Sequence, residues 1–312
     1  MIIILLSTKM KDREIDELFF TRSLQKKASA PTLKVGFGIR NLRSAAQNHP
    51  QVMVKIPRRK GKSCGLAGIA THLDYISRNG SVEIEDDDGY VYSGREGKKE
   101  IIDFLNGIAI PKQSKKREAI NFVFSMPPGT EPRAVQNAVR KMAQEQFSDH
   151  HYFFALHTDE AHPHVHLCLI VRDRNGIRIN PRKADLMEYR IRFAECLRDE
   201  GVACTATYRS QLGKSRRYQN SIIEHIKKRG GYSYIDAQKP AFYLQNIEKF
   251  KATRRTINEK YNTLVQSLFT NGKLSEAGDI CLLKEKFTKE SAQDINRPEV
   301  QINSVEYGGI DL

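Results

Sequence analysis

The chain has 312 residues, with 51 Lys and Arg against 37 Asp and Glu, a formal net charge of +14 and a pI near 9.5. This excess of positive charge favours nucleic acid or an anionic membrane surface as a partner. The apolar run at 2–6 is too short to cross a membrane, so no membrane insertion is expected. The five cysteines form no CxxC pair, so neither a disulfide scaffold nor a thiolate zinc site is indicated, and a reducing cytoplasm fits best.

The predicted elements divide the chain into successive parts. Residues 1–51 show weak periodicity and no motif, and are treated as an N-terminal extension. The part from 52 to 217 alternates short apolar runs with helical patterns. It predicts strands at 52–56, 119–126 and 152–156 and around the histidines at 164–166, helices at 66–78, 132–147 and 185–200, and a surface hairpin at 86–89. Residues 218–290 predict a helical, basic region, and 291–312 a flexible tail. Strands separated by helices predict an α+β fold with an antiparallel sheet covered by helices.

The most informative segment runs from His157 to His166 and holds four of the nine histidines. On a strand, His164 and His166 point to the same face. Residues 159–163 predict a connecting loop, so hairpin pairing would bring His157 back beside them. Three converging imidazoles leave coordination positions open, as in catalytic metal sites. Cys168 shares their face but lies among apolar residues, which favours a place in the core.

A second segment, 71–80, predicts the end of a helix that carries a tyrosine. Its apolar stripe consists of Leu66, Ile69, Leu73 and Ile76, and Tyr75 falls roughly opposite, on the side of Arg78. Just upstream lies a basic run without an acid, along which a phosphate backbone could lie. That run consists of Lys55, Arg58, Arg59, Lys60 and Lys62, and Arg78 is expected to contact DNA together with it.

A tyrosine beside cations and a three-histidine metal site suit attack on a DNA phosphodiester. The phenol would attack phosphorus while the metal polarises a non-bridging oxygen, giving a phosphotyrosyl intermediate that conserves the bond energy. Tyr90, Tyr92 and Tyr152 are rival nucleophiles, although Tyr152 is expected to pack in the sheet. The basic runs at 55–62 and 112–117 could also be ordinary solvated faces.

These segments resemble the MobA/VirD-type plasmid relaxases of the HUH endonuclease superfamily. The resemblance covers about 52–217 and rests on the order and spacing of four segments, at 72–80, 122–130, 156–167 and 192–201. It implies a five-stranded antiparallel sheet. It also implies Tyr75 as the nucleophile and His157, His164 and His166 as metal ligands. Asp159 would be a catalytic residue that orients a ligand or accepts a proton. His162 would either contact the metal ligands or contact DNA. Ile170 stands where related motifs often carry Asn.

The resemblance also implies an activity and its partners. Such proteins nick one strand at an origin of transfer, stay attached to the 5′ end, pilot it through a type IV secretion channel and rejoin the ends. Mg²⁺ or Mn²⁺ is expected, and three imidazoles also accept Zn²⁺, Co²⁺ or Ni²⁺. The partners would be single-stranded DNA near the nick, accessory relaxosome proteins and a coupling protein. The location would be the bacterial cytoplasm, with transfer to the recipient cell. The C-terminal region could serve these partners or be a solvated appendage.

Three other classes of protein stay open on the sequence alone. A rolling-circle replication initiator uses the same chemistry, and a linked helicase or origin-binding domain, which is not evident here, would favour it. A metal-dependent phosphodiesterase with an activated water would keep its activity after Tyr75→Phe. A DNA-binding protein with a structural metal would unfold when the metal is removed.

Overall fold

The computed structural model describes residues 10–20, 33–57, 65–213, 226, 228–230 and 239–295. Contacts divide the chain into two compact units, Phe20–Ala206 and a second one made of Met1–Phe19 with Thr207–Leu312. The helix α2 (Phe37–Ala46) belongs to the first unit. The domain boundaries expected at 51/52, 217/218 and 290/291 stay predictions.

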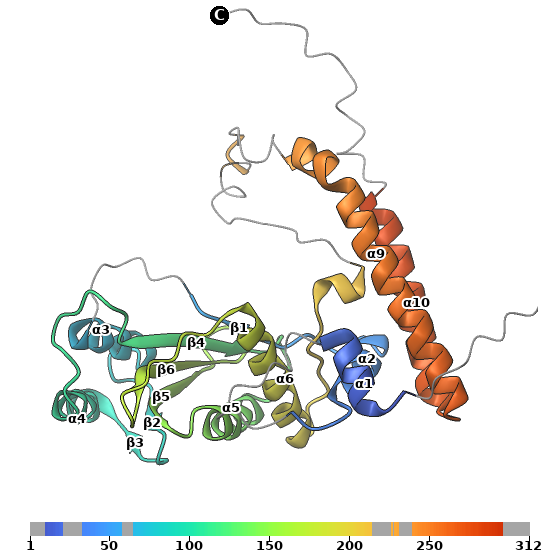
Figure 1. The fold of residues 1–312 in the computed structure, drawn as a ribbon. Helices are drawn as coiled ribbons and strands as arrows, with labels where there is room; N and C mark the ends of the chain where they lie inside the picture. Colours follow the sequence, from blue (N-terminus) through green and yellow to red (C-terminus); the bar gives the residue numbers. More distant parts are fainter. Residues whose placement is uncertain are drawn as a thin grey trace, which may run out of the picture. The chain divides into compact units, whose positions relative to one another are not determined.

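The first unit is built on a six-stranded antiparallel sheet, which confirms the α+β class (Figure 1). In chain order the strands are β1 (Met53–Lys55), β2 (Ile84–Asp86), β3 (Val91–Tyr92), β4 (Ala119–Ser125), β5 (His150–His157) and β6 (His164–Asp173). Their order in the sheet is β1-β4-β6-β5-β2-β3. The described sheet has one strand more than the five expected. The acidic turn predicted at 86–89 connects two short strands, β2 and β3, and β2 pairs with β5.

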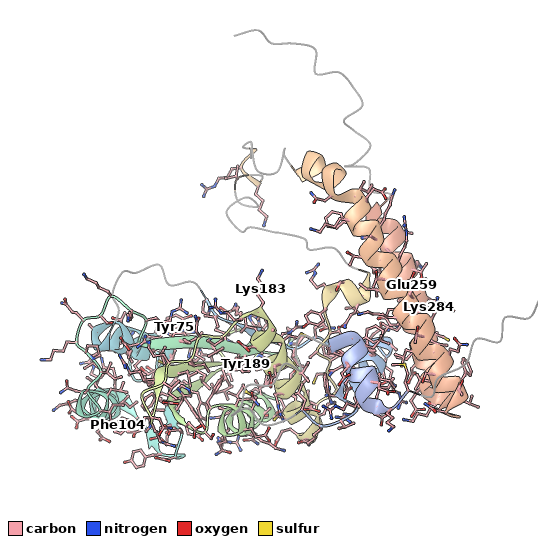
Figure 2. The ribbon with its side chains drawn as sticks, viewed as in Figure 1. Tyr75, Phe104, Lys183, Tyr189, Glu259 and Lys284 are labelled. Carbon is pink, nitrogen blue, oxygen red and sulfur yellow. The ribbon has the colours of Figure 1, made fainter. Side chains whose placement is uncertain are left out.

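One face of this sheet packs against α5 (Pro132–Gln146) and α6 (Lys183–Asp199). Alternate residues of β4 supply the aromatic contacts on this side. The ring of Phe122 lies 5.7 Å from those of Phe147 and Tyr189, and Phe124 lies 5.3 Å from Phe193 (Tyr189 is labelled in Figure 2). Phe122, Phe124 and Phe147 belong to the segments 119–126 and 132–147, for which the sequence pattern predicts a strand and a helix.

The other face packs against α3 (Leu66–Ile76) and α4 (Gly94–Gly107). The predicted stripe of α3 is buried there among β5 and β6 residues such as Phe153 and Cys168. The start of α3 is held closely, because the Leu66 N–H donates to the Pro111 carbonyl at 2.9 Å. Gly65 has φ +89°, and a Cβ there would lie 2.5 Å from the Pro111 oxygen, so this approach requires glycine.

The second unit is mainly helical, as predicted for the C-terminal part. It contains most of α1 (Asp12–Phe20), the 3₁₀ helix η2 (Arg209–Leu212), α9 (Lys239–Thr270) and α10 (Leu274–Ile295). The Tyr261 ring packs 5.1 Å from Phe19 and 5.6 Å from Phe287, and its hydroxyl donates to the Gln211 carbonyl at 2.7 Å. Part of the tail expected at 291–312 is helical, because α10 continues to Ile295. The rest of it lies outside the described residues.

Within the described ranges, no helix is both long enough and apolar enough to cross a membrane.

Phe122→Ala is expected to lower the free energy of unfolding of the first unit by about 3–5 kcal/mol, the usual cost of a cavity left by a buried Phe. Phe122 is 0 % exposed and contacts three aromatic rings. Urea unfolding followed by circular dichroism measures the loss. Ile177→Ala, at a side chain 68 % exposed, is the control and should change stability little. Equal losses for both variants would contradict this account of the core.

Candidate active site

Three histidines converge at one end of the β5–β6 hairpin. The register places His157 opposite His164, and Ala155 opposite His166. The ring centroid of His166 lies 4.6 Å from that of His157 and 5.1 Å from that of His164. One ligand atom from each histidine lies within 4.8 Å of the others. The hairpin therefore produces the convergence that the spacing predicts.

The hydrogen bonds of these rings leave one nitrogen of His157 and one of His164 able to bind a metal ion. His157 Nε2 lies 2.7 Å from the Ile76 carbonyl, which only accepts, so Nε2 carries the proton and Nδ1 keeps its lone pair. His164 Nδ1 likewise contacts the His162 carbonyl at 3.1 Å, which leaves its Nε2 available to a metal ion. In the described part of the chain, His157 Nδ1 and both ring nitrogens of His166 are buried without a hydrogen-bond partner. Buried polar atoms of this kind need an explanation, and a divalent cation supplies one.

The protonation state of the triad also suits metal binding. Burial, followed by the charges of His157 and His164, lowers the pKa of His166 to about 3. Burial is also the main cause that lowers the pKa of His157. Both imidazoles are therefore neutral near pH 7, as ligation requires.

Tyr75, which is labelled in Figure 2, lies near the end of α3, and its ring is close to this triad. The apolar stripe of α3 packs against the sheet. Tyr75 is on the opposite side of the helix and is 52 % exposed, as the sequence pattern predicts. The phenol ring centroid is 5.2 Å from His166 and 6.3 Å from His157. Among the tyrosines that the structure describes, Tyr75 is the one that makes ring contacts with the triad.

His72 is a residue to which sequence reasoning gave no role. Its ring lies 6.1 Å from that of Tyr75 and 6.4 Å from that of His166. A spacing of three residues on a helix places His72 and Tyr75 on one side, and this signal could have identified it.

Arg78 lies over the Tyr75 ring and forms an ion pair with Asp159. Arg78 Nη2 donates to Asp159 Oδ2 at 2.5 Å, and the Arg78 Cζ lies 5.3 Å from the centroid of the Tyr75 ring. Desolvation opposes ionisation of Asp159, but the hydrogen bond from Arg78, a backbone hydrogen bond and the nearby positive charges together outweigh it and lower the pKa of this carboxyl. The sequence predicted these two residues for different tasks, and the structure brings them into contact.

The remaining predicted DNA contacts and metal neighbours lie as follows. His162 is exposed, and its ring centroid is 5.7 Å from that of His164. Lys55 is exposed on the edge strand β1. Arg58, Arg59, Lys60 and Lys62 lie outside the described residues.

The rival nucleophiles occupy other positions. Tyr152 is buried, and it alternates along β5 with Phe153 and so points to the sheet face opposite the histidines. Burial raises the pKa of Tyr152 far above its ordinary value. Burial and a hydrogen bond to Asp86 do the same for Tyr92. Tyr90 is exposed, and its ring packs 4.8 Å from that of Tyr92 in the β2–β3 hairpin.

Cys168 and Ile170 lie in the apolar cluster beneath α3. The burial of Cys168 agrees with the expected core position. Because Ile170 is buried in the same cluster, the position where related motifs often carry Asn is here an apolar contact.

An antiparallel α+β domain that joins a histidine triad to an exposed tyrosine has the features of a relaxase-type nuclease domain. Residues 75–202 match the family model for MobA/VirD2-like relaxases, nuclease domain. This match is to a part of the chain that contains Tyr75 and the histidines, and it confirms the resemblance seen in the sequence.

A curated relative supports the same family. The T-DNA border endonuclease VirD2 of Agrobacterium fabrum is 29 % identical over 119 residues, which cover 34 % of this chain and 27 % of VirD2. The matched part thus spans about a quarter of that protein's length. No solved structure matches the chain at a significant level.

Proposed function

We propose that this protein nicks one DNA strand at an origin of transfer by tyrosine transesterification and later rejoins it. The observation that carries the proposal is the position of the Tyr75 ring, 5.2 Å from His166 in a triad able to hold a metal ion. The relative VirD2 is a T-DNA border endonuclease, which supports action at a defined sequence.

The proposed reaction uses the described residues in distinct roles. His157, His164 and His166 hold a divalent cation, which when bound stabilises negative charge on the phosphate oxygens. The Tyr75 hydroxyl attacks phosphorus, so that an Oη–P bond forms and the bond from phosphorus to the 3′ oxygen breaks. The phenol proton passes to water, and the 3′ oxygen takes up a proton from water and departs as a hydroxyl. Attack by that 3′ hydroxyl reverses each bond change and reseals the strand.

Recognition of DNA is proposed to rest mainly on phosphate contacts. The net charge of +14 favours a polyanion, and Lys55 on β1 is exposed for such a contact. Arg58, Arg59, Lys60 and Lys62 continue the same basic run in the sequence. Arg78, which the sequence also predicts as a DNA contact, is paired with Asp159 and is not counted among these phosphate contacts.

The cellular setting follows from the same proposal. Mg²⁺ or Mn²⁺ is the expected metal, although an imidazole triad also accepts Zn²⁺, Co²⁺ or Ni²⁺. The protein would act in the bacterial cytoplasm with accessory relaxosome proteins. A type IV coupling protein would then receive the covalent protein–DNA complex for transfer to a recipient cell.

Wild-type full-length protein is expected to form a covalent adduct with supercoiled plasmid that carries the DNA flanking its own gene. The reaction should need Mn²⁺ or Mg²⁺, stop with EDTA, and leave protein on the 5′ end after detergent denaturation. Protease treatment before electrophoresis, followed by mass spectrometry of the DNA-linked peptide, should identify the peptide that contains Tyr75. A nick with a free 5′ phosphate, or linkage to another tyrosine, would contradict the proposed mechanism.

A further inference from the structure

We propose that Arg78 is a positioning residue that fastens the end of the tyrosine helix to the metal hairpin through Asp159. This inference rests on the proposed function, because it takes Tyr75 as the nucleophile that has to be positioned. It assigns Arg78 a different main task from the phosphate contact that the basic sequence suggests. The partner of its guanidinium is a carboxylate of the same chain.

The backbone after α3 is shaped to return Arg78 toward the site. Arg78, Asn79 and Gly80 follow one another with φ values of +51°, +59° and +94°. Positive φ is uncommon for a residue with a Cβ, and it persists where surrounding structure holds it. Here the Asn79 N–H donates to the Asp74 carbonyl at 2.8 Å. A Cβ on Gly80 would lie 2.9 Å from Gly94, so the turn is packed against the start of α4.

The side chain of Arg78 contacts both parts of the site at once. Its Cζ lies over the Tyr75 ring at 5.3 Å, within the range of a cation–π interaction. Its Nη2 binds Asp159 at 2.5 Å, two residues after His157 in the loop that joins β5 to β6. One guanidinium therefore joins the tyrosine to the loop that follows the first metal ligand.

A second connection links the same two elements. The Ile76 carbonyl, next to Tyr75, accepts a hydrogen bond from His157 Nε2 at 2.7 Å. On the N-terminal side of Tyr75, Asp74 forms an ion pair with Lys98 of α4 at 2.6 Å. Contacts on both sides of Tyr75 thus fix the end of α3, and Arg78 supplies the side-chain contact nearest the phenol ring.

The ion pair with Asp159 favours a positioning role for Arg78 over the binding of a phosphate. Asp159 already neutralises the guanidinium at hydrogen-bond distance, so a phosphate would have to compete with a carboxylate for that edge. A displacement of about 1 Å at a reacting group can lower a rate by about 100-fold, which gives this link a measurable effect.

The test compares Arg78→Asn, Arg78→Lys, Asp159→Asn and the Arg78→Asn/Asp159→Asn double variant in the full chain. Asn tolerates positive φ, so Arg78→Asn removes the guanidinium with the turn retained. Arg95→Asn, at an exposed arginine of α4, is the matched control for loss of charge. Single-turnover adduct formation on a single-stranded oligonucleotide of the origin gives the rate, and titrations at several salt concentrations give the affinity.

Arg78→Asn and Asp159→Asn are each expected to slow adduct formation by about 10–100-fold. The double variant should be no slower than the slower single variant, because both disrupt the same link. DNA affinity and its salt dependence should match wild type and Arg95→Asn, and Arg78→Lys should fail to restore the rate. Losses that multiply would overturn the proposal. So would a weaker affinity with a salt slope reduced by about one, restored by Lys, because this is the result of a phosphate contact.

A readout that needs no cleavage separates this inference from the proposed function. If wild type forms no adduct, the transesterase proposal fails. Thermal unfolding of wild type, Arg78→Asn, Asp159→Asn and the double variant still tests the Arg78–Asp159 link. Shifts of the midpoint that are not additive in the double variant support the link, and additive shifts overturn it.

Discussion

Tyr75→Phe is expected to abolish the covalent protein–DNA adduct while DNA affinity and the fold stay as in wild type. The substitution removes the hydroxyl and keeps the ring that packs beside His166 and under Arg78. Loss of a nucleophile should lower the rate by at least about 10⁴-fold. Quenched time courses on origin DNA, resolved in denaturing gels, measure this rate, and a mobility-shift titration measures affinity.

The control for this substitution is Tyr90→Phe. Tyr90 is 59 % exposed, similar to Tyr75, but lies in the β2–β3 hairpin away from the triad. It should form adduct at the wild-type rate. An adduct that survives Tyr75→Phe would move the nucleophile to another tyrosine. Metal-dependent nicking without any adduct would instead establish a phosphodiesterase that uses water.

His166→Ala is expected to weaken the binding of Mn²⁺ by at least about 100-fold, because second-shell changes alone cost about 10–100-fold. The His166 ring lies 4.6 Å from that of His157 and 5.1 Å from that of His164, and both of its ring nitrogens are buried without a hydrogen-bond partner in the described structure. Isothermal titration calorimetry gives the affinity directly. Nicking should fall with metal occupancy and recover in part at high Mn²⁺ concentration.

His151→Ala is the control for removal of a histidine from β5. His151 lies near the other end of this strand, paired with Asp87, and its loss should leave Mn²⁺ affinity unchanged. Circular dichroism of wild type with EDTA should show a folded protein, because the sheet is held by apolar packing on both faces. Unfolding with EDTA would favour a structural metal over a catalytic one.

Much of the first unit could be predicted from local sequence patterns. The alternation around His164 and His166 defines a strand face, and the spacing to His157 defines a hairpin register, which the pairing of His157 with His164 confirms. The stripe from Leu66 to Ile76 correctly gave the face of α3 that turns into the sheet and left Tyr75 outside.

Contacts between distant segments could not be predicted in the same way. Arg78 and Asp159 are 81 residues apart, and neither residue type indicates the other as its partner. The Ile76 carbonyl that orients His157 is a backbone group, so its role leaves no mark on residue type. The pairing of β2 with β5 also depends on tertiary packing, since two strands of two or three residues carry little pattern of their own.

The attachment of α3 at both ends has a consequence for how this domain can vary. The Leu66 N–H is bound to Pro111 at one end and the Ile76 carbonyl to His157 at the other. One inserted residue would turn Tyr75 by about 100° around the helix and displace it by about 1.5 Å, away from the triad. The helix is therefore a spacer of fixed length, and viable insertions or deletions among related domains should fall outside 66–76.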